Sequence, residues 1–432
     1  MTVRRLSLRC RAEPPTVPGG EADRAPTPLG RGSEPTARSE RDGGSLAHRG
    51  TMVFRVTRSR RIALWRRVTF LAAVAVLLCG KGGSARADVF TVRLDDGEVV
   101  KVAARHAGTG QGAYALEFSD GQIHLIPADR VVSQEAQPDP PPISHEEQLS
   151  RLVAEFGETR TLTDIAKPFV IVLVRSSQRP WEPSVEKRLE AVVTQAGKFF
   201  RGMQTSFLEF VKQAHVETTP VKYPLPVIIF EHDQQFNAYA VATSDGKGLS
   251  APSTAAFYDV LSNRLVLRLS ECTTFDTPLH EAVHQQVYNR GILQRLAPIP
   301  FWFHEGLATG FEGDGERIRS GPRAISDRYG QMALRAKVVD WREIIANDRA
   351  FQGDVLAGEA YGHAWGLHWL LVTKYRTEYH KLVRHFAAKK PLEVDRPDER
   401  IAEFERIVGK SVDVLQREFH TELPRAMARR KH

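Results

Sequence analysis

The sequence predicts an α+β protein, in which a mixed sheet precedes a largely helical C-terminal part and a small β domain stands in front of both. Three observations support this fold class. Residues 88–135 alternate between polar and apolar side chains in short runs that Asp-Gly turns separate. Continuous apolar and mostly β-branched runs at 169–174 and 227–230 flank a long helical pattern at 185–212. Beyond residue 277 nearly every segment has helical spacing.

The net charge is unevenly distributed along the chain. The 432 residues carry a formal charge of +8, and 42% of them are hydrophobic, which is enough for a packed core. Residues 1–87 contain 17 Lys or Arg and 6 Asp or Glu, whereas residues 88–432 contain 43 and 46. The basic excess therefore belongs to the N-terminal segment. The folded body is close to neutral, which argues against a nucleic-acid partner.

The first 87 residues predict an export signal. Residues 1–51 are rich in Pro, Gly, Arg and Ser and read as a disordered or mis-called extension, with Met52 as the physiological start. Residues 52–87 then have the three parts of a secretory signal peptide: a basic region without acids, an apolar stretch and a cleavage site with small residues, Ala85-Arg86-Ala87.

The apolar stretch of that signal, residues 68–79, has only 12 residues and is too short to span a bilayer comfortably. We therefore expect a mature protein that begins near Asp88, has no stable membrane span, and is secreted or periplasmic. Two arginine pairs precede the apolar stretch, so both the general and the twin-arginine export routes remain open. Of the three cysteines only Cys272 remains in the mature chain, which excludes a disulfide framework and a cysteine-rich zinc site.

Residues 88–135 are expected to form about five short strands, as in a small SH3-like barrel, and to serve as an accessory binding module. The segment from Gly108 to Gly112 is interpreted as a loop between strands, because no helix follows it to complete a phosphate-binding cradle. Residues 136–150 form a Pro-rich linker and the start of a helix over 145–156. Residues 151–432 then make one domain, which includes a hairpin over 256–269.

The most informative stretch is a helix that begins near Thr277, which can cap it, and ends before Gly291. His280 and His284 are one turn apart and project from the same face, so both can bind one metal ion. Glu281 is rotated by about 100° and can hold a water in an open coordination position. The pattern H-E-x-x-H is typical of zinc sites in which the glutamate is the general base.

Two histidines leave a catalytic zinc one protein ligand short. The segment Phe301-Trp302-Phe303-His304-Glu305-Gly306-Leu307-Ala308 offers two candidates on a second helix. Glu305 lies 21 residues beyond His284, and His304 competes with it. Because adjacent helical residues point about 100° apart, the two cannot easily bind the same ion.

The combination of His280-Glu281-x-x-His284 with Trp302-x-x-Glu305-Gly306-Leu307-Ala308 resembles the gluzincin metallopeptidases, and most closely an uncharacterised bacterial family among them. The resemblance covers about residues 166–425. It implies a zincin-like catalytic domain and one Zn²⁺ per chain, held by His280, His284 and Glu305.

The resemblance also implies roles for residues outside the metal helices. A peptide substrate would pair along the strand 264–269, and Tyr361 would stabilise the oxyanion, with His363 and His368 as alternatives. One feature departs from the thermolysin-like pattern, because Thr309 stands where those enzymes carry an acid. Asp276 and Glu312 both remain candidates for the carboxylate that orients a histidine.

The expected function is that of an exported zinc metallopeptidase. Zinc would polarise the scissile carbonyl and lower the pKa of a water, Glu281 would move the proton from that water to the leaving amine, and Tyr361 would donate to the oxyanion. Two alternatives stay open: a catalytically silent binding or scaffold protein with the same fold, and a hydrolase of non-peptide amides. The presence of Glu281 favours the enzymes, because a pure binding site needs the ligands but not the base.

Overall fold

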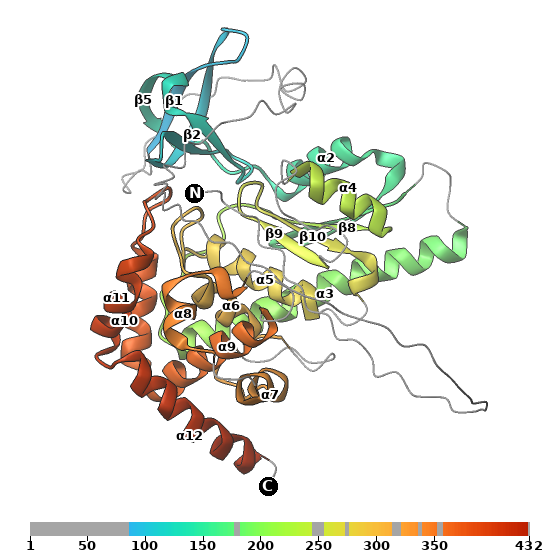
Figure 1. The fold of residues 1–432 in the computed structure, drawn as a ribbon. Helices are drawn as coiled ribbons and strands as arrows, with labels where there is room; N and C mark the ends of the chain where they lie inside the picture. Colours follow the sequence, from blue (N-terminus) through green and yellow to red (C-terminus); the bar gives the residue numbers. More distant parts are fainter. Residues whose placement is uncertain are drawn as a thin grey trace, which may run out of the picture. The chain divides into compact units, whose positions relative to one another are not determined.

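The structure is a computed structural model that describes residues 86–176, 182–243, 255–272, 276–312, 321–335, 339–351 and 357–430. These residues form a mixed α+β fold with two five-stranded sheets, as the sequence predicts (Figure 1). The expected extension and all but the last two residues of the expected signal peptide lie outside the described residues. Among the helices of the described part, none combines the length and apolar character needed to cross a membrane.

The N-terminal sheet is antiparallel, in the order β4-β3-β2-β1-β5, and its small core consists of Phe90, Val92, Ala104 and Leu116. Its five strands agree in number with the sequence expectation, while closure into an SH3-like barrel remains a prediction. The last strand extends three residues into the expected linker. The strands are β1 (Arg86–Arg93), β2 (Val99–Gly110), β3 (Ala113–Glu117), β4 (Ile123–Pro127) and β5 (Val131–Pro138).

The prediction of a loop at Gly108–Gly112 is wrong for the first three residues, because strand β2 continues to Gly110. A different segment of the chain explains these glycines. A Cβ atom on Gly110 would collide with the carbonyl oxygen of Leu392, and one on Gly108 would lie 2.9 Å from that of Pro391. The glycines therefore allow a distant backbone to approach the strand, which is a common reason for glycine inside a strand.

The second sheet has the order β6-β7-β8-β10-β9, with β7, β8 and β10 parallel and an antiparallel strand at each edge. The expectation that a substrate pairs along 264–269 needs correction, because β10 is hydrogen-bonded to strands on both sides and the edge beside the metal helix is β9. Strand β6 was not predicted. The strands are β6 (Thr161–Ala166), β7 (Phe169–Val174), β8 (Leu225–Phe230), β9 (Ala256–Asp259) and β10 (Arg264–Arg268).

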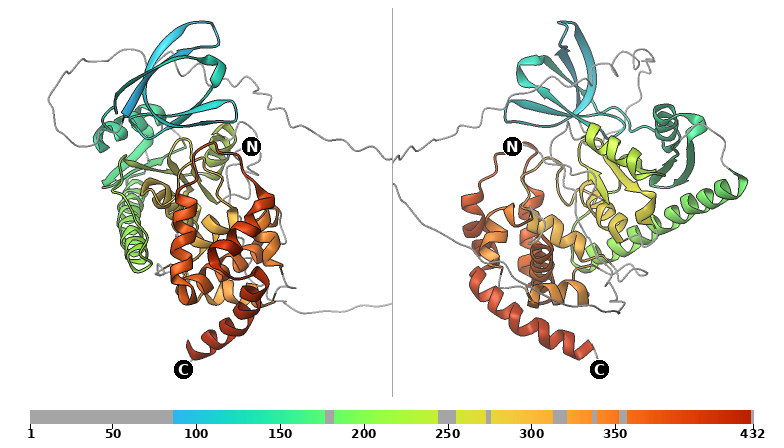
Figure 2. Two further views of the ribbon diagram at one scale, coloured as in Figure 1. Left: turned by 90° about the vertical axis from the view of Figure 1, so that its left-hand side faces the viewer. Right: turned by 45° about the vertical axis from the view of Figure 1, so that its right-hand side comes forward.

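Helices cover both faces of this sheet, because the side chains of its central strands alternate between two cores. One core gathers Val170, Val172 and Ile228 with residues of α2 (His145–Phe156) and α4 (Asp233–Thr243). The opposite face packs on α3 (Pro183–Gln213) and joins the main hydrophobic core. Figures 1 and 2 show α2 and α4 on one side of the sheet and α3 on the other.

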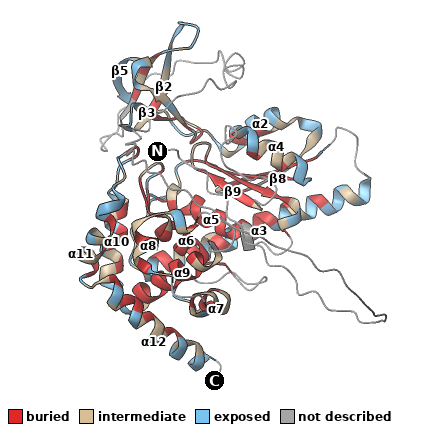
Figure 3. Ribbon diagram, in the orientation of Figure 1, coloured by how far each residue is buried: buried red, intermediate tan, exposed pale blue. Residues whose placement is uncertain are grey.

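The C-terminal part is helical, as expected, and its helices share the main core (Figure 3). Helix α9 packs directly on α6, and Gly306 makes that approach possible. A Cβ atom at Gly306 would lie 2.5 Å from the carbonyl oxygen of Ala364 on α9. The helices are α5 (Asp276–Asn289), α6 (Phe301–Thr309), α7 (Asp327–Arg335), α8 (Trp341–Ala346), α9 (Ala357–Lys374), α10 (Arg376–Ala387), α11 (Arg400–Val408) and α12 (Val412–Arg430).

Candidate metal centre

Helix α5 brings the two histidines of the H-E-x-x-H motif together. The Nε2 atoms of His280 and His284 lie 3.1 Å apart, and the two side chains are 4% and 7% exposed. The helix begins at Asp276, so Thr277 lies in its first turn and not before it, contrary to the capping role expected from the sequence. Gly291, two residues beyond the helix, has the positive φ of 69° that a residue past a helix end often adopts.

Helix α6 supplies the third group of the cluster, and it is Glu305. Its Oε2 lies 3.1 Å from Nε2 of His280 and 3.7 Å from Nε2 of His284, and the residue is fully buried. The three donor atoms lie within 4.8 Å of one another. His304 is not part of this group: its Nδ1 lies 3.0 Å from the other oxygen of Glu305, and its ring is 5.4 Å from that of His284.

The neighbouring carboxylates dominate the electrostatics of the cluster. Burial alone would lower the pKa of His280, but the hydrogen bonds and charges of Glu305 and Glu312 outweigh it and raise the pKa well above its usual value. Burial lowers the pKa of His284 to about 4. Burial alone would raise the pKa of Glu305, but the charges and hydrogen bonds of the neighbouring histidines outweigh it and keep the pKa well below its usual value. Two imidazole nitrogens and one carboxylate oxygen form a donor set with which proteins bind divalent metals such as zinc. The residues present can therefore hold a metal ion.

Glu281 lies on α5 beside these ligands, buried to 1% exposure. Its Oε2 accepts a hydrogen bond of 2.9 Å from the backbone N–H of Tyr258 in β9. Within the described residues its Oε1 has no hydrogen-bond partner. Burial raises the pKa of this carboxyl to about 8. The group is thus held by one oxygen and offers the other to a ligand.

Glu312, three residues after the end of α6, is one of the two carboxylates that the sequence analysis considered as partners of a histidine. Its Oε1 lies 2.7 Å from Nδ1 of His280, on the side of the ring opposite Glu305, and its Oε2 accepts from the hydroxyl of Tyr329 on α7. Of the two candidate carboxylates, Glu312 thus lies on a histidine of the cluster, and the side chain of Asp276 lies outside the described residues. Tyr329 was missed because no local pattern connects it with the motif.

The three candidate oxyanion donors all lie on α9 but have different surroundings. The ring of Tyr361 is 6.4 Å from that of His280, in an edge-to-face arrangement. His363 accepts a hydrogen bond of 3.0 Å from Trp341 Nε1, and His368 lies 3.2 Å from the hydroxyl of Tyr379. Burial lowers the pKa of both histidines, to about 4 and about 3. Of the three, Tyr361 is the one whose ring contacts a proposed metal ligand.

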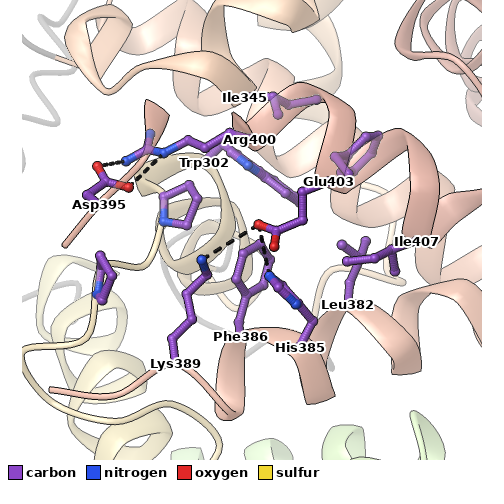
Figure 4. Close-up of a pocket in the computed structure, with 13 residues that line it drawn as sticks. Trp302, Ile345, Leu382, His385, Phe386, Lys389, Asp395, Arg400, Glu403 and Ile407 are labelled. Atoms are coloured by element: carbon purple, nitrogen blue, oxygen red, sulfur yellow. Dashed lines mark hydrogen bonds and ion pairs between the residues drawn. The ribbon is translucent and has the colours of Figure 1, made fainter. Parts of the chain in front are cut away.

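A separate cavity lies behind α6, between α8, α10 and α11 (Figure 4). Trp302 forms part of its wall. Its charged groups are paired with one another: Arg400 lies 2.6 Å from Asp395, and Glu403 lies 3.0 Å from His385 and 3.6 Å from Lys389. Because these charges already neutralise each other, the cavity offers no unpaired charge to a ligand.

Comparison with known proteins adds one similarity. Residues 274–393 match a family described as a protein of unknown function (DUF1570). The matched stretch contains the cluster His280, His284 and Glu305 together with Glu281, Glu312 and Tyr361. No curated protein matches the chain.

Proposed function

We propose that this protein is an exported zinc-dependent metallopeptidase of the gluzincin type. One observation carries the proposal: the buried convergence of His280 Nε2, His284 Nε2 and Glu305 Oε2, beside a glutamate that keeps one oxygen free of protein hydrogen bonds. A zinc ion held there supplies a Lewis acid for the scissile carbonyl and lowers the pKa of a water. Proton transfer, orientation of the ligands and stabilisation of the oxyanion are assigned to side chains of the protein.

Glu281 is the general base in this proposal. The Tyr258 N–H fixes its Oε2, and a cation bound beside it would favour the ionised carboxylate despite the pKa of about 8. Oε1 is then left to take a proton from the attacking water and to pass it later to the leaving amine. Glu312 holds Nδ1 of His280 and so directs Nε2 toward the cluster. Tyr361 is the proposed oxyanion donor, because its ring lies next to that of His280.

Edge strand β9 is the proposed place for a peptide. In the described part of the chain it pairs with β10 on one side only, and its residue Tyr258 touches the general base. An extended peptide can add to such an edge through main-chain hydrogen bonds. In this proposal a peptide would lie beside Glu281, and we therefore favour peptide substrates over other amides.

The decisive experiment compares Glu281→Gln with the wild type for zinc content and peptide turnover. We expect one zinc per chain in both proteins, and turnover at least about 10²-fold lower in the variant, because the amide cannot accept a proton. Glu271→Gln, a partly exposed glutamate before α5, is the matched control and should behave as wild type. Tyr361→Phe should lower turnover less, since the metal still polarises the carbonyl.

Two outcomes would contradict the proposal. Wild-type turnover by zinc-loaded Glu281→Gln would rule out the assigned base. A wild-type protein that binds zinc but cleaves nothing in a broad peptide library would favour the scaffold alternative or the hydrolase of non-peptide amides.

Export is the second part of the proposal, and it rests on the basic and apolar pattern of residues 52–87. The N-terminus of protein recovered from the cell exterior or periplasm should lie near Asp88. An exported product that retains Arg4 or Met52 would contradict it.

A further inference from the structure

One side chain links the N-terminal sheet to the loop that joins the two ligand-bearing helices. Arg295 lies in that loop, residues 290–300, and is 8% exposed. Its guanidinium donates to Glu117 Oε1 at the end of β3, to the carbonyl of Gly121 at 2.8 Å, and to the carbonyl of Val260 at 3.2 Å. Val260 directly follows β9. Arg295 therefore ties together the sheet, the α5–α6 loop and the β9–β10 hairpin.

Glu117 is the anion that holds Arg295 in place. It is 5% exposed and also accepts from Arg105 on β2 and, at 2.9 Å, from the hydroxyl of Tyr223. Burial alone would raise the pKa of Glu117, but the charges of Arg295 and Arg105 outweigh it and lower the pKa below its usual value. Removing Arg295 would leave Glu117 with Arg105 and Tyr223, but it would break the connection from the sheet to the loop.

Backbone contacts repeat the same connection. The N–H of Ile123 in β4 donates to the carbonyl of Leu261 in the hairpin turn at 2.7 Å. The N–H of Leu392, whose carbonyl lies against Gly110 of β2, donates to the carbonyl of Leu296 at 3.0 Å. The sheet thus contacts the hairpin turn directly, and it reaches the α5–α6 loop both through Arg295 and through the segment around Leu392.

The hairpin in turn reaches the proposed general base. The hydroxyl of Tyr258 donates to Asn263 at 2.7 Å, while its backbone N–H donates to Glu281. Asn263 and Asn289 exchange amide hydrogen bonds of 2.9 and 2.7 Å, which fasten the hairpin turn to the end of α5. A displacement of the hairpin would therefore move the donor that orients Glu281.

We infer that the N-terminal sheet is a structural part of the metal centre, with Glu117 and Arg295 as positioning residues that fix the α5–α6 loop and the β9–β10 hairpin. This differs from the accessory binding module that the sequence suggested. The ligands come from two helices that this loop connects in the chain, and a metal site requires its ligands to be held within about 0.5 Å. The kinetic consequences rest on the proposed peptidase function, whereas those for metal affinity and backbone protection do not.

The test compares Arg295→Met with Arg105→Met in the full chain. Both substitutions remove one arginine from Glu117, but Arg105 stays within the N-terminal sheet and touches neither the loop nor the hairpin. We expect Arg295→Met to weaken zinc binding about tenfold, as for residues that support metal ligands, and to lower kcat more than it changes KM. Arg105→Met should keep wild-type zinc affinity. Arg295→Lys retains the charge but lacks the planar guanidinium, so its zinc affinity should lie between those of Arg295→Met and Arg105→Met.

A second measurement separates positioning from general stability. Amide hydrogen exchange of the metal-free proteins should become faster at 256–263 and 290–300 in Arg295→Met and stay unchanged there in Arg105→Met. If Arg295→Met fails to fold, Glu117→Gln replaces it, and the same two segments should show the change.

Wild-type zinc affinity together with unchanged exchange in both segments would overturn the inference. A wild-type protein that binds zinc without cleaving peptides would overturn only the proposed peptidase function. The zinc-affinity and hydrogen-exchange comparisons would still test the positioning role of Glu117 and Arg295.

Discussion

Glu312 Oε1 lies 2.7 Å from Nδ1 of His280, although the two residues are 32 positions apart in the chain. The same carboxylate accepts from Tyr329, so α7, the segment after α6, and α5 meet at one charged group. A carboxylate on the far nitrogen fixes the tautomer and the ring orientation of a ligand histidine.

Removal of this carboxylate should weaken metal binding. We expect Glu312→Ala to lower zinc affinity on the order of 10- to 100-fold, and Glu312→Gln to lower it less, because the amide oxygen can still accept from Nδ1. Tyr329→Phe should have the smallest effect of the three, since it removes only the support of Glu312. Competition with a chelator of known affinity measures all three. Wild-type affinity in Glu312→Ala would show that His280 is oriented without this residue.

The third ligand can be tested by a pair of substitutions on α6. Glu305→Gln should bind zinc markedly more weakly, because a neutral amide replaces the only anionic group of the cluster. His304→Ala should keep zinc, because His304 contacts Glu305 but does not converge with the three donors. Zinc content after gel filtration distinguishes the two variants. If His304→Ala lost the metal and Glu305→Gln retained it, the assignment of the ligand would be reversed.

The close contact between α6 and α9 predicts a stability effect at Gly306. A methyl group there would lie 2.5 Å from the Ala364 carbonyl oxygen, so the two backbones must separate. We expect Gly306→Ala to lower the free energy of unfolding by about 1–3 kcal/mol. Gly358→Ala is the control, because no atom lies within 4 Å of its added carbon. It should be neutral or stabilising by up to about 1 kcal/mol. Urea denaturation measures both, and equal stability of the two variants would contradict the packing argument.

Buried His363 predicts a loss of stability in acid. Its folded-state pKa is about 4 because of burial, whereas an unfolded histidine titrates near pH 6.5. Between these values the unfolded chain binds a proton that the folded chain does not, so the free energy of unfolding falls as pH decreases, by about 1.4 kcal/mol per pH unit.

The substitution His363→Asn tests that prediction, because its amide oxygen can still accept from Trp341 Nε1 while nothing titrates. Metal-free His363→Asn should lose less stability than the wild type between pH 7 and pH 5. His232→Asn, an exposed histidine, is the control and should follow the wild type. Parallel pH profiles for His363→Asn and the wild type would exclude His363 as the cause.

Much of the local structure could be predicted from the sequence. The helix over His145–Phe156 and the strand Phe169–Val174 have the predicted bounds, and the hairpin around 256–269 is confirmed. These elements depend on short-range periodicity and turn residues, which a sequence displays directly. Strand β6, with its mixed polar and apolar residues, lacks that signal and was missed.

The sequence by itself determined that His280 and His284 share one helix face, because a helix repeats every 3.6 residues and four positions make about one turn. The sequence also limited the candidates for the third ligand to two adjacent residues, His304 and Glu305. Only the tertiary structure decided that Glu305 joins the cluster, that Glu312 has its carboxylate on His280, and that β9 is the edge strand. The same holds for the link from Glu117 to Arg295, which are 178 positions apart. Such contacts arise from the packing of whole helices and sheets, and no local spacing in the sequence encodes which of many distant carboxylates the fold will place there.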